Sequence, residues 1–145
     1  MSLYVLDASV IAKWFVPERW SEEAARLLDG THELAVPDLL WPELGNLLWK
    51  KSRAAQLTAR EARLIVQSLE RMPLAVFPSR LVLEAALEIA LNTGRTVYDS
   101  VYLALAVALE CRLITADERL VNALAGSPFA ASVAWLGELP PEQIS

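Results

Sequence analysis

Four acidic side chains, Asp7, Glu43, Asp99 and Asp117, are the residues of this sequence best placed to do chemistry together. Carboxylate oxygens are the ligands that Mg²⁺ and Mn²⁺ prefer, whereas zinc favours cysteine and histidine. The chain has only one of each, so a zinc site is not expected. Four carboxylates at one place would repel one another unless a cation lay between them. We therefore expect these acids to bind Mg²⁺, with Mn²⁺ as a substitute.

Two of the acids follow predicted strands. Asp7 comes directly after Leu3 to Leu6, and Asp117 comes one alanine after Leu113 to Thr115. Both are therefore placed at the carboxyl ends of strands, and open α/β sheets bind ligands at that edge, where the strand order reverses. Taken alone, Asp7 is better explained as a turn residue, and Asp99 and Asp117 are better explained as helix caps. Glu43 taken alone is better explained as a charge at the edge of a buried face. The prediction of a metal site therefore depends on a fold that brings the four acids to one place.

The other two acids belong to predicted helices. Asp99 opens a long apolar helix, where the positive end of the helix dipole favours an anion. Glu43 lies on or beside the buried stripe of a helix that begins near Asp38, three residues after Leu40 and four before Leu47. A carboxylate on an apolar face needs a partner, and a shared metal ion supplies one.

Two hydroxyl side chains adjoin the acids. Ser9 and Thr115 are each two residues from an aspartate, so they are candidates to orient a carboxylate or a metal-bound water. Local capping explains them equally well. His32 falls in a predicted turn, and we expect it at the surface. No His or Cys stands near a nucleophile and no glycine-rich phosphate loop occurs, so neither a catalytic triad nor a nucleotide loop is predicted.

Five short apolar runs alternate with longer helical patterns. The predicted strands are Leu3 to Leu6, Leu34 to Val36, Ala75 to Phe77, Leu113 to Thr115 and Val133 to Leu136. Short apolar strands separated by helices are typical of a parallel sheet that is covered on both faces. The predicted fold is an α/β class, three-layer α/β/α sandwich with a mostly parallel sheet of about five strands.

Several signals mark where the helices begin and end. Ser21 is predicted to cap one helix, and Thr58 with Glu61 forms a capping box ahead of another. A third helix is expected from Ser79 to Thr93, closed by a glycine. The helix around Tyr102 is apolar on nearly all sides, so we expect it to be central and buried.

Length and composition limit the class of protein. With 145 residues, 54% hydrophobic and 21% charged, the chain is expected to form one domain over residues 1–145. The longest apolar run, Val101 to Leu109, is far shorter than the ~20 residues that span a bilayer, and no targeting segment is recognisable. We therefore expect a cytoplasmic protein with no membrane contact. The tail after Leu139 is expected to be loose.

The net charge of −5 argues at first against a nucleic-acid binder, because phosphate neutralisation usually needs a basic surface. If the four acids bind metal, however, 14 carboxylates remain against 13 Lys and Arg. The rest of the surface is then nearly neutral. The charge alone therefore neither supports nor excludes a protein that binds nucleic acid.

Four sequence blocks resemble the motifs of PIN-domain proteins, and more narrowly those of VapC-type toxins from bacterial and archaeal toxin–antitoxin pairs. They are Leu-Asp-Ala-Ser at 6–9, Glu-Leu-Gly-Asn-Leu-Leu at 43–48, Tyr-Asp-Ser-Val-Tyr-Leu-Ala-Leu-Ala at 98–106 and Leu-Ile-Thr-Ala-Asp-Glu-Arg-Leu at 113–120. The last two blocks are the more specific. The resemblance covers nearly the whole chain.

This resemblance implies a function and a set of partners. It implies an endoribonuclease that hydrolyses RNA phosphodiester bonds with Mg²⁺ or Mn²⁺, with Asp7, Glu43, Asp99 and Asp117 as its site. It also implies a toxin that a small antitoxin protein inhibits, and a homodimer. The sequence does not specify which RNA is cleaved, because base readout depends on loops and groove shape.

Two other classes of protein share some of these sequence features. A receiver-type signalling domain has a similar length and sheet, but it needs an aspartate after the third strand and a late lysine. Here Pro78 and Ser79 follow Phe77, and no lysine follows Lys51. The second alternative is a non-catalytic interaction module with the PIN fold, and the complete set of acids argues against it.

Aromatic residues point to a possible protein interface. Five tryptophans are a high count for this length, and Trp14, Phe15, Trp41 and Trp49 all fall in the first two helical segments. They either pack in the core or line a groove that receives an amphipathic helix. Under the resemblance, the occupant is the antitoxin, with a basic side chain, often Arg, that reaches the acids.

Overall fold

Five parallel strands form the centre of the molecule, as the sequence predicts. The structure, a computed structural model, describes residues 2–139, so the tail after Leu139 lies outside the described residues. The strands are β1 (Ser2–Leu6), β2 (His32–Pro37), β3 (Leu74–Phe77), β4 (Arg112–Thr115) and β5 (Val133–Trp135). They pair in the order β3-β2-β1-β4-β5, and every pair is parallel. The order reverses at β1, so ligands are expected where β1 and β4 end.

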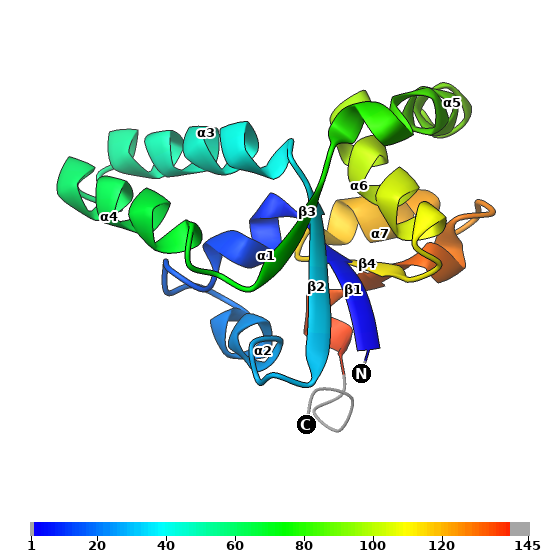
Figure 1. Ribbon diagram of the computed structural model, residues 1–145. Coiled ribbons are helices and arrows are strands. Elements are labelled where there is room, and N and C mark those ends of the chain that lie inside the picture. The colour runs from blue at the N-terminus through cyan, green and yellow to red at the C-terminus, as the bar shows by residue number, and fades with distance from the viewer. Residues whose placement is uncertain (1, 140–145) are drawn as a thin grey trace.

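Seven α-helices within residues 2–139 cover the sheet. They are α1 (Ala8–Ala12), α2 (Ser21–Arg26), α3 (Leu40–Arg53), α4 (Ala59–Leu69), α5 (Leu83–Thr93), α6 (Val97–Ala108) and α7 (Glu118–Leu124), with 3₁₀ turns at Ser79–Val82, Ala130–Ser132 and Leu136–Glu138. Figure 1 shows α1 to α4 on one side of the sheet and α5 to α7 on the other, which gives the three predicted layers. None of the described helices has the length and apolar character needed to cross a bilayer.

Alternating side chains of the central strands contribute to two separate cores. Leu6 and Ile114 pack with the helices of one face, whereas Val5 and Leu113 pack with those of the other. All four side chains are fully buried. Helix α6 is enclosed as predicted, since residues 100–106 are all buried. The ends of β1 and β4 are thus held firmly from both sides.

The helix-end predictions are confirmed at the start of α4 and the end of α5, but they are wrong at the starts of α2 and α5. Helix α5 begins at Leu83 and not at Ser79, because Ser79–Val82 form a 3₁₀ turn. Thr58 caps α4 in the predicted capping box. Gly94 ends α5 with a φ of 75°, a left-handed conformation that glycine adopts without steric cost. At α2, however, the N-cap residue is Trp20, and Ser21 is the first residue of the helix. The Ser21 hydroxyl instead accepts a hydrogen bond from the N–H of Glu18.

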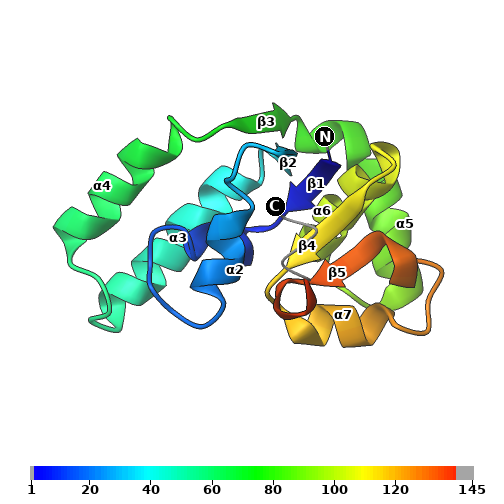
Figure 2. The same ribbon diagram turned by 90° about the horizontal axis from the view of Figure 1, so that it is seen from below.

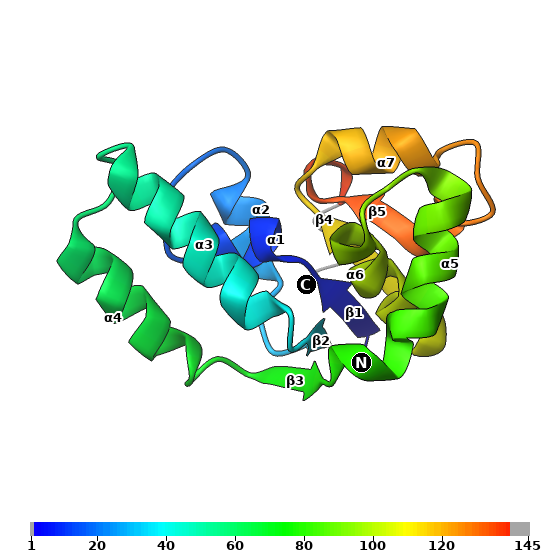
Figure 3. The same cartoon turned by 90° about the horizontal axis from the view of Figure 1, so that it is seen from above.

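Helices α3 and α4 form an antiparallel pair that projects from the sheet, as Figures 2 and 3 show. We call residues 40–72 the arm. Its inner side is apolar and belongs to the core on the α1 side, through the buried residues Leu40, Leu44, Leu48, Ile65 and Leu69. Its outer side carries long charged side chains that are exposed to solvent.

His32 is not the surface turn residue that the sequence predicts. It is the first residue of β2, and its side chain is only 2% exposed. Its ring centroid lies 5.2 Å from that of Tyr4, and its Nε2 lies 4.0 Å from Oδ1 of Asp29. The imidazole therefore packs at the amino end of the sheet, opposite the edge where β1 and β4 end.

Candidate active site

The four predicted acids come from distant parts of the chain and line one cleft. Asp7, Glu43, Asp99 and Asp117 border a hollow of about 140 Å³ beyond the ends of β1 and β4. The remaining wall residues are Ala8, Ser9, Tyr102, Leu113 and Leu120. We call this hollow the acid cleft. It lies at the reversal of strand order, where the fold is expected to bind a ligand.

Asp7 is the acid with the most hydrogen bonds. One carboxylate oxygen, Oδ1, accepts from the Ser9 hydroxyl at 2.5 Å and from the N–H of Val10 at 3.3 Å, which caps α1. The other, Oδ2, accepts from the Thr115 hydroxyl at 2.5 Å. Because Thr115 ends β4, this carboxylate ties together the ends of two neighbouring strands.

Ser9 and Thr115 connect Asp7 to the loop after β4. The Ser9 hydroxyl accepts from the N–H of Ala116 at 3.1 Å, and the Thr115 hydroxyl accepts from the N–H of Asp117 at 3.0 Å. Each hydroxyl thus accepts from the backbone and donates to the Asp7 carboxylate. Such contacts fix the orientation of a ligating group.

Burial raises the pKa of Asp7 to about 6, from its ordinary value of 3.8, because the ionised carboxylate loses contact with water. The hydrogen bonds from Ser9, Thr115 and Val10 lower this pKa and offset part of the rise, while the nearby carboxylate of Asp99 adds to it. A cation beside a buried carboxylate favours its ionised form. A cation next to Asp7 would therefore stabilise this carboxylate strongly.

Glu43 enters the acid cleft from the first turn of α3. Burial raises its pKa, the hydroxyl of Tyr102 lowers it in part, and the carboxylate of Asp99 raises it further. Burial also raises the pKa of Tyr102, and Glu43 adds to that effect. The Tyr102 hydroxyl lies beside Glu43 without standard hydrogen-bond geometry to any group within residues 2–139. It is therefore a buried donor next to the acids.

Asp99 and Asp117 occupy the starts of two helices. Asp99 is the third residue of α6, and its carboxylate forms an ion pair with Arg95 at 3.3 Å. Asp117 caps α7, where its carboxylate accepts from the N–H of Arg119 at 3.0 Å. The capping role considered for Asp117 is therefore present together with its position in the acid cleft, whereas Thr96, and not Asp99, caps α6.

The side chains of the acid cleft fit a hard divalent cation by their chemistry. They offer carboxylate and hydroxyl oxygens, which Mg²⁺ and Mn²⁺ accept as ligands. In the part of the chain that the structure describes, no three carboxylate, imidazole or thiol groups lie close enough together to hold an ion as they stand. The carboxylates are engaged with protein groups instead, such as Asp99 with Arg95. A cation would therefore compete with these internal partners.

Tyr102 and Arg95 are two residues of the site that the sequence reasoning missed. Tyr102 is three residues after Asp99 on α6, and this spacing places both on one side of the helix. The interval of three residues between Asp99 and Tyr102 is the sequence signal that could have identified Tyr102 as a site residue. Arg95 precedes the helix, so helical spacing did not predict its ion pair with Asp99.

Comparisons with known proteins identify the family. Residues 4–125 match the PIN domain. The chain is also 40% identical over 120 residues to Ribonuclease VapC3 of Pyrobaculum aerophilum, a match that covers 81% of this chain and 92% of that protein. The chain therefore belongs to the PIN-domain family.

Solved structures share the fold at lower identity. The crystal structure of PAE2754 from Pyrobaculum aerophilum superposes with a TM-score of 0.71 at 22% identity, covering 99% of this chain and 89% of that one. A toxin–antitoxin complex from Klebsiella pneumoniae gives a TM-score of 0.59 at 16% identity, with coverage of 96% and 100%. These likenesses agree with the PIN-like α/β sandwich.

Proposed function

We propose that this chain is an endoribonuclease that hydrolyses RNA phosphodiester bonds with Mg²⁺, or with Mn²⁺ as a substitute. The observation that carries the proposal is the acid cleft, in which four carboxylates from separate segments share one small hollow. A relative at 40% identity is named a ribonuclease, which supports the same activity here. We place this activity in the cytoplasm.

Asp7 and Asp99 are the acids that we assign to direct metal contact. Ser9 and Thr115 fix the Asp7 carboxylate by hydrogen bonds and so act as positioning residues. Glu43 and Asp117 complete the set of ligands or hold the attacking water. When bound, the divalent cation lowers the pKa of a coordinated water and stabilises charge on the phosphate and the leaving oxygen.

The test is a cleavage assay with a labelled RNA and purified protein. Wild-type protein should cleave in Mg²⁺ or Mn²⁺ and stop in EDTA, and Asp7→Asn should be inactive under all conditions. Glu88→Gln, an exposed acid on α5, is the matched control and should retain full activity. Cleavage that persists in EDTA would exclude the metal mechanism. An inactive wild-type protein would favour the non-catalytic interaction module instead.

The proposal includes a biological role as the toxin of a toxin–antitoxin pair. A structural neighbour is a toxin–antitoxin complex, which supports this role. Expression of the chain alone should arrest growth of the producing cell through RNA cleavage, and the Asp7→Asn form at an equal level should be harmless. Equal tolerance of both forms would exclude the toxin role while leaving the nuclease activity open.

The four aromatic residues predicted to form a protein interface differ in how far they are buried. Trp14 and Phe15 pack against the core, and the Trp14 Nε1–H donates to the carbonyl of Ala24 at 2.8 Å. Trp41 and Trp49 are instead 39% and 53% exposed. Only the α3 tryptophans therefore remain available to a partner.

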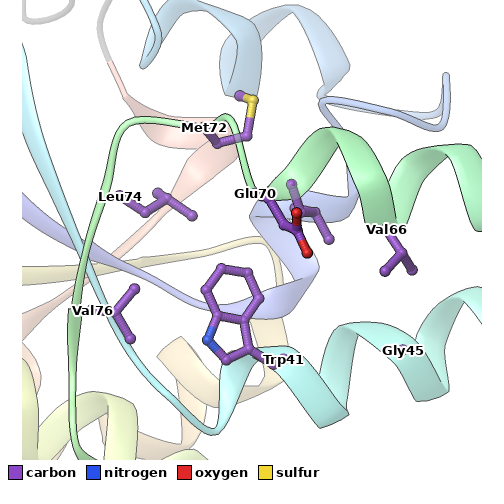
Figure 4. A pocket seen from close by; sticks show the side chains of 8 residues that line it. Trp41, Gly45, Val66, Glu70, Met72, Leu74 and Val76 are labelled. Atoms are coloured by element: carbon purple, nitrogen blue, oxygen red, sulfur yellow. The ribbon is translucent and has the colours of Figure 1, made fainter.

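We assign the antitoxin to the groove that contains Trp41. This groove of about 500 Å³ lies between α3, α4 and β3, and Figure 4 shows its labelled side chains around the hollow. Its walls are Trp41, Gly45, Val66, Leu69, Glu70, Met72, Leu74 and Val76, so Glu70 is the one charged residue lining it. An amphipathic segment that is apolar along one side and carries a basic residue fits such a surface.

Co-expression with the short reading frame beside the gene tests this partner. The two proteins should co-purify without nuclease activity, and Val66→Asp in the groove should abolish association. Leu64→Asp is the matched control, because Leu64 has a similar exposure on α4 but does not line the groove. Association without inhibition, or equal effects of both variants, would exclude the assignment.

A homodimer is the last part of the proposal. Leu83, Leu87 and Leu91 recur at intervals of four on α5 and are 53%, 47% and 70% exposed, a stripe suited to pairing with the same stripe of a second copy. Size-exclusion chromatography with light scattering should give a dimer for wild-type protein and a monomer for Leu87→Glu. A monomeric wild-type protein would exclude the dimer.

A further inference from the structure

Charge is divided unequally between the arm and the rest of the chain. The arm contains six Lys and Arg against three Glu, whereas the remaining residues contain seven Lys and Arg against fifteen Asp and Glu. A protein with a net charge of −5 thus carries a positive arm on a negative body. A polyanion that approaches the acid cleft is attracted by the arm and repelled by the body.

One side of α3 leads out of the acid cleft. Glu43, Asn46 and Lys50 follow one another at intervals of three and four residues, so they lie along the same side of the helix. Together with Ala8 and Leu47 they line a hollow of about 330 Å³. This hollow shares Ala8 and Glu43 with the acid cleft, so the two adjoin.

The same side continues to the end of α3. The guanidinium of Arg53 lies 5.2 Å from the ring centroid of Trp49, which is 53% exposed. Lys50 and Arg53 are exposed and take part in no ion pair within residues 2–139. Their neighbour Lys51 is bound to Glu18 at 3.0 Å. Within residues 2–139 no carboxylate therefore neutralises Lys50 or Arg53, and the Arg53 guanidinium lies over the Trp49 ring.

We infer that a single-stranded stretch of RNA lies along this side of α3, with phosphates at Asn46, Lys50 and Arg53 and a base stacked on Trp49. We call these four residues the RNA strip. The inference rests on the proposed ribonuclease function and names where its substrate binds outside the acid cleft. Cations beside an exposed aromatic ring are the combination that binds single strands, through phosphate contacts and base stacking.

The dimensions of α3 suit this ligand. Lys50 is seven residues after Glu43, or about 10 Å along the axis at ~1.5 Å per residue. About three stacked nucleotides span that distance at ~3.4 Å each. A protein partner requires apolar area instead, and the apolar groove is lined by Trp41 and Gly45, whereas none of the four residues of the RNA strip lines it. The groove and the RNA strip of one helix thus suit two different ligands.

The test is a binding titration with the full chain carrying Asp99→Asn, which leaves the RNA intact. A short fluorescein-labelled single-stranded RNA is followed by fluorescence anisotropy in Mg²⁺ buffer. Adding Lys50→Ala and Arg53→Ala should weaken binding by about tenfold or more and reduce the slope of log Kd against log salt by ~0.7 per lost contact. The matched control is Arg60→Ala with Arg63→Ala, which removes the same charge from α4 and should change Kd less than twofold.

Trp49 provides a second measurement. Trp49→Ala should weaken binding without changing the salt slope, and Trp49→Phe should restore most of the affinity, because a base still stacks on the smaller ring. In the active protein, Lys50→Ala with Arg53→Ala should raise KM and leave kcat unchanged.

The outcomes separate this inference from the proposed function. If wild-type protein cleaves RNA while the strip variants and the control bind alike, the inference fails and the nuclease stands. If the strip variants lose the antitoxin rather than the RNA, the surface belongs to a protein partner and the inference fails. Selective loss of RNA binding in a chain that does not cleave RNA would support the strip and reject the nuclease.

Discussion

The acid cleft and the arm differ in charge, in burial and in how their side chains are held. In the acid cleft, Asp7 is fixed by hydroxyls from β4 and α1, and the four acids line one small hollow. On the arm, Lys50 and Arg53 are exposed on long flexible stems. A metal site needs ligands in fixed positions, whereas attraction of a phosphate backbone tolerates mobile charges. Substitutions in the cleft should therefore change kcat, and substitutions on the arm should change binding.

The largest effect is expected in the acid cleft. Asp99→Asn removes a proposed ligand and also the ion-pair partner of Arg95. The kcat should fall by roughly three orders of magnitude or more, because the remaining acids cannot hold the ion in place. A steady-state cleavage assay at saturating RNA measures this, together with circular dichroism to show that the fold is intact. A normal kcat for Asp99→Asn would contradict the assignment of Asp99 as a metal ligand. It would also contradict the expectation that substitutions in the cleft change kcat whereas those on the arm change binding.

A core substitution tests the helix that the two regions share. Leu44 is fully buried on α3, one residue after Glu43, so Leu44→Ala should lower the free energy of unfolding by about 2–5 kcal/mol. Urea denaturation measures the loss. Leu64→Ala on the exposed surface of α4 is the control, with an expected change within about 0.5 kcal/mol. Equal losses of unfolding free energy for Leu44→Ala and Leu64→Ala would mean that Leu44 does not anchor α3 in the core.

The raised pKa of Asp7 predicts a pH dependence that is confined to the cleft. Its pKa is about 6 in the folded chain and 3.8 when unperturbed, so between these values the folded state binds more protons than the unfolded state. This stabilising contribution is fully present below 3.8 and is lost as the pH rises through 6, with a total of at most about 3 kcal/mol.

The measurement is the Tm of metal-free protein between pH 4 and pH 7, taken as the difference between wild type and Asp7→Asn. The wild type should lose stability relative to the variant as the pH rises, since asparagine does not ionise. Charge removal on the arm, by Lys50→Ala, should leave this difference unchanged. A difference that is independent of pH would show that Asp7 has an ordinary pKa.

The smallest expected effect concerns the turn that leads to Asp99. Gly94 has a φ of 75°, so Gly94→Ala should destabilise the fold by about 1–2 kcal/mol through backbone strain. Gly126→Ala is the matched control, because Gly126 has no positive φ and no atom within 4 Å of an added Cβ. Thermal unfolding compares the two, and equal shifts would exclude strain as the cause.

Local sequence pattern predicted the strands, the start of α4 and the end of α5. The apolar runs that became β1 and β4 are short and are separated from one another by helical patterns, and Thr58 carries its capping partner three residues away. Parallel pairing then placed Asp7 and Asp117 at the same edge, which follows from topology once the strands are known.

What the sequence did not predict depends on contacts between distant residues. Trp20 took the N-cap position of α2 in a left-handed conformation, which is rare for a large side chain. His32 became buried because its ring packs on Tyr4 of the neighbouring strand. Tyr102 was expected only as part of a buried apolar helix, although its hydroxyl lies beside Glu43. Each of these outcomes requires the tertiary structure.

The most direct test of the account is Mn²⁺ binding to the purified chain, measured by isothermal titration calorimetry at pH 7.5 and again at pH 5. The account predicts saturable binding at the higher pH. It also predicts weaker binding at the lower pH, where Asp7 is protonated, and loss of binding in both Asp7→Asn and Asp99→Asn. Glu88→Gln and Lys50→Ala should bind as wild type does. Absence of binding to the wild type, or unchanged binding in Asp99→Asn, would contradict the claim that the acid cleft is a metal centre.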